Sequence, residues 1–247
     1  MTDEISMYFR MKGGWRCALL IVGMLVFSPS AAFPETAKAR DWAFVRQVLL
    51  SYDNKEGRGS VYRWSKSPKY FAFMESPSQQ KAARQAVETV NQVLSGVGLQ
   101  ASFMTERRDE YDALIGVIAQ SGMQRIWQAA GCGRFVGYLV DGAACVHVDA
   151  NTDEIDTVFI LVDEDQDDHG QASTLLEEVY QSFGVRNDHQ IYRESLTYDG
   201  PDRTYRRTLA PIDKKVLIFL YQYLEPGDDE LTVRRKFDAH WHEIVVY

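Results

Sequence analysis

The sequence predicts one α/β domain, in which helices cover a sheet, and three observations support this. Strand-like and helix-like patterns follow the order strand, helix, several strands, helix, irregular link and helix. Residues 157–162 are a continuous apolar run, as expected for a strand that is buried on both faces. The 247 residues are 45% apolar and 25% charged, which is typical of a soluble globular protein with one core.

The first part of the chain predicts a leading helix, a broken strand and a long helix. Apolar residues recur at helical spacing over residues 36–50, which indicates a short amphipathic helix. Residues 61–64 and 70–74 both indicate strand. A second helix is expected at 77–94, where Gly96 supplies the stop.

The later elements are predicted from alternating and turn-bounded patterns. The pair Asp141-Gly142 is a strong turn signal, and it predicts a hairpin between residues 135–140 and 144–148. The other expected elements are strands at 99–104, 113–119 and 157–162, and helices at 121–130, 173–183, 211–224 and 229–241.

The N-terminus has the pattern of an export signal. Three basic residues precede the apolar run 17–27, and small residues that suit cleavage after Ala32 follow it. The run is too short to cross about 30 Å of hydrocarbon comfortably. Residues 1–32 are therefore predicted to be a removed signal peptide, and a retained N-terminal membrane anchor is the alternative. Translation that starts at Met7 or Met11 would remove two acidic residues that are unusual in such a segment.

Charge and cysteine content narrow the choice of partner and compartment. The formal charge is −8 for the whole chain, and it stays clearly negative without residues 1–32. This argues against nucleic acid or anionic lipid as the main partner. Cys132 and Cys145 remain after cleavage, and they either form a disulfide in an oxidising compartment or are two small buried residues.

Residues 177–188 carry a pattern of known spacing, Glu-Glu-Val-Tyr-Gln-Ser-Phe-Gly-Val-Arg-Asn-Asp. Zinc peptidases of the metzincin type have H-E-x-x-H-x-x-G-x-x-H, with three histidine ligands, a general-base glutamate and a glycine turn. Here the three ligand positions hold Glu177, Gln181 and Asn187, the base position holds Glu178, and the turn holds Gly184.

Neighbouring segments extend this resemblance. Ser195-Leu196 lies where those enzymes form a tight turn beneath the metal, and residues 209–213 look like the start of their closing helix. Together with the Arg63-Trp64 pair, these features closely resemble the bacterial family called domain of unknown function 2927 (DUF2927), which shows E-E-x-x-Q-x-L-G-x-x-N-D.

The resemblance implies a zincin-like (metzincin-type) mixed sheet with a helix equivalent to the active-site helix and with C-terminal helices. It covers roughly residues 61–225. The expected organisation is a signal peptide at 1–32, a leading helix and linker at 33–60, the zincin-like domain at 61–225 and a C-terminal helical tail at 226–247.

The ligand positions lack the donors that zinc prefers. A hydrolytic zinc site needs three firm ligands, usually imidazole or thiolate, whereas Gln181 and Asn187 offer neutral amide oxygens. No zinc or other cofactor is therefore expected. Glu177 and Gln181 are equally an ordinary i, i+4 helix pair. If one of the adjacent glutamates is buried it needs a partner, for which Arg186, Arg193 or the turn at 187–188 are candidates.

Each of the other candidate sites can be read either as a metal or ligand site or as side chains that are simply solvated or packed. Asp163, Asp165 and Asp167 have calcium-loop spacing, but the later loop positions fail, so a solvated acidic loop is favoured over calcium. His189 is out of register with the motif by two residues. His240 and His242 would share a face only on an extended segment, and a packed tail is preferred. A histidine two residues after Cys145, His147, is expected to be packed or exposed.

Three functions remain open for a periplasmic or secreted protein that has no membrane span after signal cleavage. The first is a non-catalytic zincin-like domain that binds a peptide, an envelope protein or a glycan along a sheet edge. The second is a hydrolase or peptidase with atypical metal ligands or none, in which Glu178 acts as general acid or base. The third is a structural component of the cell envelope.

Overall fold

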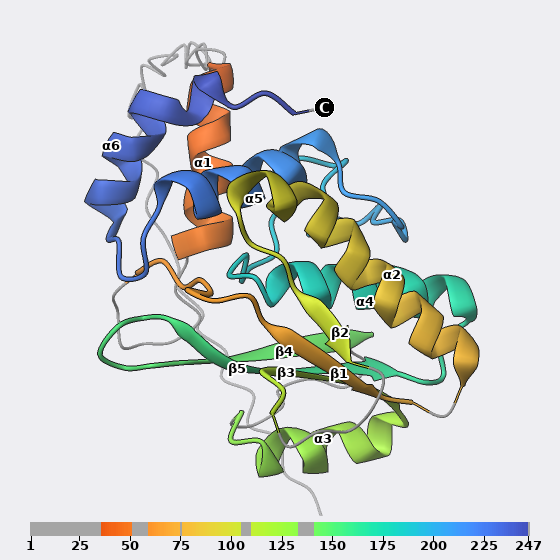
Figure 1. Ribbon diagram of the computed structural model, residues 1–247. Helices are drawn as coiled ribbons and strands as arrows, with labels where there is room; N and C mark the ends of the chain where they lie inside the picture. The colour runs from red at the N-terminus through yellow and green to blue at the C-terminus, as the bar shows by residue number, and fades with distance from the viewer. Residues whose placement is uncertain (1–35, 51–58, 75, 105–109, 133–140, 247) are drawn as a thin grey trace, which may run out of the picture. The chain divides into compact units, whose positions relative to one another are not determined.

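The computed structural model describes residues 36–50, 59–74, 76–104, 110–132 and 141–246 (Figure 1). Its centre is a five-stranded sheet in the order β2–β1–β3–β5–β4. The first four strands in this order run parallel, and β4 pairs antiparallel with β5. The strands are β1 Lys69–Phe73, β2 Ser102–Met104, β3 Ala113–Ile118, β4 Gly142–Val148 and β5 Ile155–Asp163. The predicted α/β class with a mixed sheet is confirmed.

Helices lie on both faces of this sheet. The helix α3 (Gln120–Ala129) lies on one face, whereas α2 (Pro77–Leu94) and α4 (Asp168–Gln181) pack against each other on the opposite face (Figure 1). Beyond them lie α5 (Pro211–Tyr223), α1 (Ala37–Leu50) and α6 (Glu230–His240). Apolar residues of α1, α2, α4, α5 and α6 join one core, so the C-terminal helix shares the core of the main domain.

Most of the predicted elements are present, and short 3₁₀ turns follow two of the helices. These turns are η1 Ser95–Val97 and η2 Trp241–Glu243. The helices expected at 36–50, 77–94, 121–130, 211–224 and 229–241 and the strands expected at 70–74, 99–104, 113–119 and 157–162 are confirmed with small shifts of their ends.

The strand prediction for residues 61–64 is wrong. Within this segment and its flank the structure has isolated bridges, between Ser60 and Asp229 and between Arg63 and Glu154. The Arg63 guanidinium instead donates to backbone carbonyls at the end of α5, two of them at 3.3 Å. Side-chain anchoring of this kind holds the segment outside the sheet.

One turn prediction is corrected, and another lies partly outside the described residues. The left-handed residue after α2 is Gly98, with φ of 79°, and not Gly96, because η1 extends the helix end first. Gly142 is the first residue of β4 and pairs with Val162, and β4 and β5 form the hairpin that the structure describes. The predicted partner arm at 135–140 lies outside the described residues.

The helix predicted at 173–183 starts earlier, at Asp168. The Asp167 carboxylate caps it by accepting the backbone N–H of Gly170 at 2.7 Å, which draws part of the expected acidic loop into α4. Among the described residues, no helix combines the length and the apolar character that a membrane crossing requires. The predicted signal peptide at 1–32 lies outside these residues.

Candidate functional site

The helix α4 places both motif glutamates inside the protein. Glu177 is 4% exposed and Glu178 is 6% exposed. The strand β4 passes so close to this helix that a side chain at Gly142 would collide with Thr174. The helix and the outermost strand of the described sheet therefore form two walls of one cleft.

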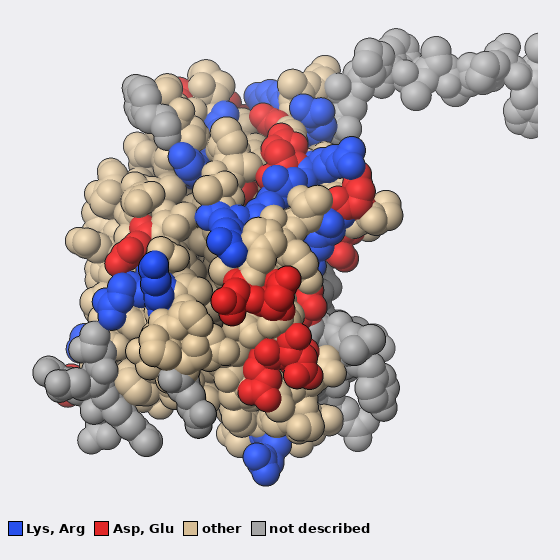
Figure 2. All heavy atoms as spheres, turned by 90° about the vertical axis from the view of Figure 1, so that its right-hand side faces the viewer, with Lys and Arg blue, Asp and Glu red and all other residues tan. Residues whose placement is uncertain are grey.

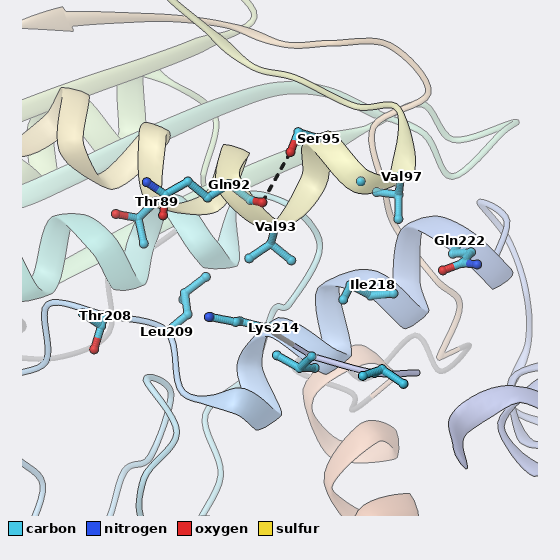
Figure 3. A pocket seen from close by; sticks show the side chains of 13 residues that line it. Thr89, Gln92, Val93, Ser95, Val97, Thr208, Leu209, Lys214, Ile218 and Gln222 are labelled. Atoms are coloured by element: carbon cyan, nitrogen blue, oxygen red, sulfur yellow. Dashed lines mark hydrogen bonds between the residues drawn. The ribbon is translucent and has the colours of Figure 1, made fainter. Parts of the chain in front are cut away.

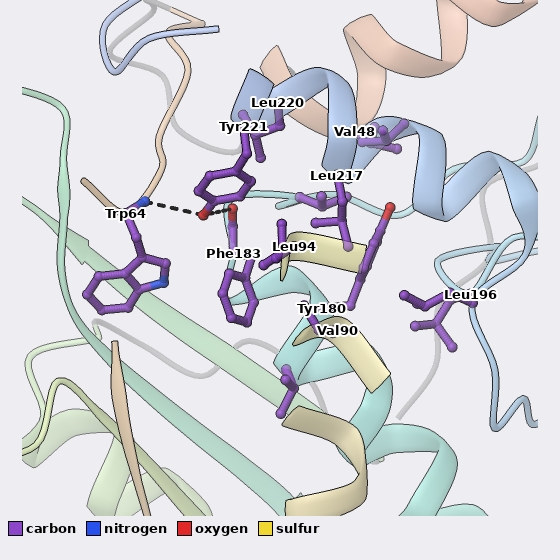
Figure 4. Close-up of a cluster of buried hydrophobic side chains, with 14 of the residues drawn as sticks. Val48, Trp64, Val90, Leu94, Tyr180, Phe183, Leu196, Leu217, Leu220 and Tyr221 are labelled. Carbon is purple, nitrogen blue, oxygen red and sulfur yellow. Dashed lines mark hydrogen bonds between the residues drawn. The ribbon is translucent and has the colours of Figure 1, made fainter. Parts of the chain in front are cut away.

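The end of α4 is fixed by hydrogen bonds from two aromatic side chains, of which Figure 4 draws the one from Tyr221. The indole of Trp64 donates to the carbonyl of Ser182 at 3.0 Å, and the Tyr221 hydroxyl donates to the carbonyl of Phe183 at 2.9 Å. Gly184 follows with φ of 102°, in the left-handed region that favours glycine. The predicted glycine turn is thus present, and it sets the direction of the residues after the helix.

The cleft has a volume of about 430 Å³ and is lined by residues from several segments of the chain. Among the described lining residues, acidic side chains outnumber the one arginine, so ionisable groups determine the chemistry of the cleft. The lining residues are Trp127, Asp141, Gly142, Ala143, Ala144, Thr174, Glu177, Glu178, Gln181, Asp188, Asp199 and Arg203.

Arg203 supplies the cation of this cleft. Its guanidinium nitrogen lies 2.5 Å from Oε2 of Glu177, and 32% of the arginine side chain is exposed against 5% for the glutamate. Burial raises the pKa of Glu177, and Arg203 opposes this rise. Glu177 is therefore the carboxyl of the motif pair that ionises first, and Arg203 neutralises it.

Burial favours the neutral form of Glu178. Burial is the main cause that raises its pKa well above the ordinary value, and the adjacent carboxyl of Glu177 adds to the effect. The backbone N–H of Ala144 donates to the side chain, whereas Oε2 has no hydrogen-bond partner among the described residues. The cleft thus contains a buried acid that holds its proton more tightly than an exposed glutamate does.

The third ligand position of the motif, Asn187, points away from the cleft. Gln181 lines the cleft, and its amide donates to Oδ1 of Asp188 at 2.9 Å. Asn187 does not line the cleft, because its amide donates to the carbonyl of Gln47 in α1 at 3.1 Å. The structure therefore brings Glu177, Gln181 and Asp188 to this cleft and turns Asn187 toward α1.

These residues do not fit a catalytic zinc ion. Two of the three motif positions carry amides, and the remaining carboxylate binds a guanidinium at 2.5 Å. Amide oxygens are weak zinc ligands, and a protonated arginine beside the third donor repels a divalent cation. No step of a reaction is therefore assigned to a metal here.

The arginines suggested from the sequence as partners of the glutamates are the wrong ones. Arg186 stacks over the ring of Tyr62 and donates to the carbonyls of Leu49 and Ser60. Arg193 forms an exposed ion pair with Asp202. The true partner, Arg203, lies 26 residues after Glu177 in an irregular segment, where no local spacing signals the contact.

The acidic segment before α4 provides helix capping and a charged surface. Oδ1 of Asp163 accepts the backbone N–H of Asp165 at 3.1 Å, and Asp167 caps the helix. These three carboxylates do not form a cluster with ligand atoms close enough to share an ion. Figure 2 shows Asp and Glu side chains gathered on the side of the molecule where α4 begins in Figure 1.

The candidate histidines are separate from the motif cleft. His189 is buried, its Nδ1 accepts the backbone N–H of Ile191 at 3.0 Å, and burial lowers its pKa to about 4. His240 in α6 stacks on Tyr223, and its neighbour His242 lies in η2. The two C-terminal histidines therefore pack in different ways.

The Ser195-Leu196 turn is tied to the start of α5 by a buried carboxylate. Asp213 accepts hydrogen bonds from the Ser195 hydroxyl at 2.5 Å and from the Leu196 backbone at 2.9 Å. Burial raises the pKa of Asp213 to about 6, although these bonds oppose the rise.

Cys132 and Cys145 form a disulfide, with their Cα atoms 5.9 Å apart.

A second hollow of about 670 Å³ lies between the end of α2, α5 and the C-terminal residues (Figure 3). Among the described residues that line it, Lys214 is the one ionisable side chain, and most others are apolar or neutral. We place the candidate site in the motif cleft because that cleft combines buried carboxyls with a bound arginine.

The fold and the site together define an α/β domain with a buried carboxyl pair and an arginine between a helix and an outer strand. The chain belongs to the family described as a protein of unknown function (DUF2927), whose model matches residues 40–237. No curated protein matches the chain.

Proposed function

We propose that this chain is an exported, non-catalytic protein with a zincin-like fold, and that it binds a peptide or an envelope protein in the motif cleft. One observation carries the proposal: Glu177 is neutralised by Arg203 of the same chain. The Gln181 amide is likewise bound to Asp188. The former ligand positions are thus satisfied internally, and the cleft is available for recognition.

The charge of the cleft indicates the kind of ligand. Asp141, Asp188 and Asp199 line it together with the neutralised Glu177–Arg203 pair. Carboxylates therefore exceed cations, and a segment that carries lysine or arginine fits this cleft better than an acidic one. An extended peptide is supported by the position of β4, which is the outermost strand of the described sheet, because an edge strand can pair with an added strand through its backbone groups.

Binding of a labelled lysine-rich peptide, followed by fluorescence anisotropy, tests this proposal. Asp199→Asn removes one exposed charge of the cleft and is expected to weaken binding about 2–5-fold, in proportion to an exposed ion pair. Glu88→Gln is the matched control, because Glu88 is exposed on α2 outside the cleft. Equal affinity of wild type and Asp199→Asn, or equal binding of a glutamate-rich peptide, would contradict the proposal.

A second candidate function is favoured by the state of Glu178. A buried carboxylic acid with a raised pKa and one unpartnered oxygen in a cleft is suited to general acid or base chemistry. This alternative is a hydrolase in which Glu178 transfers the proton and Glu177 assists. A screen of peptide and ester substrates distinguishes the two: hydrolysis that is lost in Glu178→Gln supports the enzyme, and intact substrate supports the binding protein.

Export to the periplasm or the cell exterior is part of the same proposal. It is supported by the basic, apolar and small-residue pattern of residues 1–32 and by the disulfide, since such bonds persist in oxidising compartments. Retention as an N-terminal anchor is the alternative outcome of the same segment.

A further inference from the structure

Two sulfur atoms and one imidazole meet on the face of the sheet that α3 covers. Cys132 follows the end of α3, and its backbone N–H donates to the carbonyl of Trp127 at 3.0 Å. Cys145 and His147 are two residues apart on β4, so their side chains point to the same face. In the part of the chain that the structure describes, these three residues are the one group with metal-ligand atoms within 4.8 Å of one another.

The distances in this group match two edges of a zinc tetrahedron. Nε2 of His147 lies 3.5 Å from Sγ of Cys145 and 3.7 Å from Sγ of Cys132. Zinc–sulfur and zinc–nitrogen bonds of about 2.3 and 2.0–2.1 Å at tetrahedral angles place sulfur and nitrogen about 3.6 Å apart. Both sulfur–nitrogen edges are therefore already present.

The surroundings hold the imidazole in place and leave the group accessible. The ring of His147 contacts Phe159 edge to face, with ring centroids 5.8 Å apart. Cys132 and His147 are partly exposed, whereas Cys145 is 8% exposed. The site is thus ordered by packing and reachable by a reductant and by an ion from solvent.

We propose that Cys132, Cys145 and His147 form a redox-linked Zn²⁺ site, in which the disulfide and the bound metal are alternative states. A dithiol reductant passes two electrons and two protons to the disulfide and itself becomes a disulfide, which leaves two thiols. Zn²⁺ then replaces both thiol protons, which pass to solvent, and His147 binds through Nε2. Water occupies the fourth position of a three-ligand site. None of the three residues lines the motif cleft, and the proposal does not depend on the function proposed for that cleft.

The test uses the full chain with Cys17→Ser, which leaves two cysteines. The protein is reduced with a water-soluble phosphine, whose oxide takes its oxygen from water, and Zn²⁺ binding is measured by calorimetry, with Co²⁺ absorption as evidence for thiolate ligands. Reduced protein is expected to bind one equivalent, and disulfide-bonded protein is expected to bind none at this site. His147→Gln should weaken binding about tenfold or more, and His242→Gln, an exposed histidine elsewhere, should not.

Thermal unfolding gives a second readout. Zn²⁺ should raise the melting temperature of the reduced protein, because it binds the folded state, and should have a much smaller effect on reduced His147→Gln. Reduced protein with two free thiols that binds no Zn²⁺ would overturn the proposal. Equal Zn²⁺ affinity of wild type and His147→Gln would also overturn it, because the imidazole would then not be a ligand.

Discussion

Replacing Arg203 by methionine tests the assignment of this residue as the internal cation of the cleft. Methionine keeps the apolar stem and removes the guanidinium, so the Glu177 carboxyl, whose side chain is 5% exposed, loses its ion-pair partner. Breaking a buried ion pair costs about 3–5 kcal/mol of the free energy of unfolding. Because 32% of the Arg203 side chain is exposed, water screens the pair, and we expect the lower end of that range, about 3 kcal/mol, once Glu177 is ionised in wild type.

The pH dependence of this loss follows from the raised pKa of Glu177. A folded-state pKa above the unfolded value makes the folded protein bind more protons, so stability falls as pH rises between the two values. Arg203 opposes this rise, so its removal raises the folded-state pKa of Glu177 further. The pH range over which stability falls then extends to higher pH. Burial raises the pKa of Glu177 to about 8, so the deficit of Arg203→Met should be about 1 kcal/mol or less near pH 5, where Glu177 is protonated in both proteins, and should grow above pH 8 toward about pH 10.

Urea unfolding of wild type and variant at both pH values measures this deficit. Arg193→Met is the matched control, since its ion pair with Asp202 is exposed and should contribute less than about 1 kcal/mol. In Arg203→Met, a further Glu177→Gln change should restore most of the stability that is lost near about pH 10. A variant as stable as wild type near about pH 10, or a deficit independent of pH, would refute the assignment.

Three further predictions concern the motif and the N-terminus. Glu178→Gln should gain stability relative to wild type as pH rises above about 5, because the raised pKa of the buried acid makes wild type less stable toward alkaline pH; parallel melting curves of both proteins across pH would contradict this. Gly184→Ala should lose about 2 kcal/mol or more in urea unfolding, because its φ of 102° and the Tyr62 carbonyl exclude a side chain. Gly96→Ala, with open space around the added carbon, should change stability by less than about 1 kcal/mol. Mass spectrometry of exported protein should find cleavage after Ala32, and an intact N-terminus on membrane-bound protein would favour the anchor instead.

Periodic elements could be predicted from the sequence because their burial repeats along the chain. The helix α2 carries five buried residues on one stripe, and β5 is an apolar run paired on both sides. Residues 61–64 are similarly apolar, but they have no paired strand on either side in the described sheet. There the side chains of Arg63 and Trp64 bond to the ends of α5 and α4, and a local pattern does not reveal such long-range anchors.

The candidate site could be predicted only in part for a related reason. The i, i+4 spacing fixes which side of α4 carries Glu177 and Gln181, so their shared place in the cleft follows from the helix. The turn after Gly184 follows no such period, and it directs Asn187 to α1 and Asp188 to the cleft. Arg203 reaches Glu177 through tertiary structure alone.

The most direct test of the central claim is the metal content of the disulfide-bonded protein, purified without chelators or a metal-affinity tag. With Arg203 bound to Glu177 and amides at two ligand positions, the account predicts no stoichiometric zinc in this form. One equivalent of zinc in the disulfide-bonded protein, lost in Glu177→Gln, would contradict it and would restore the motif cleft as a metal centre.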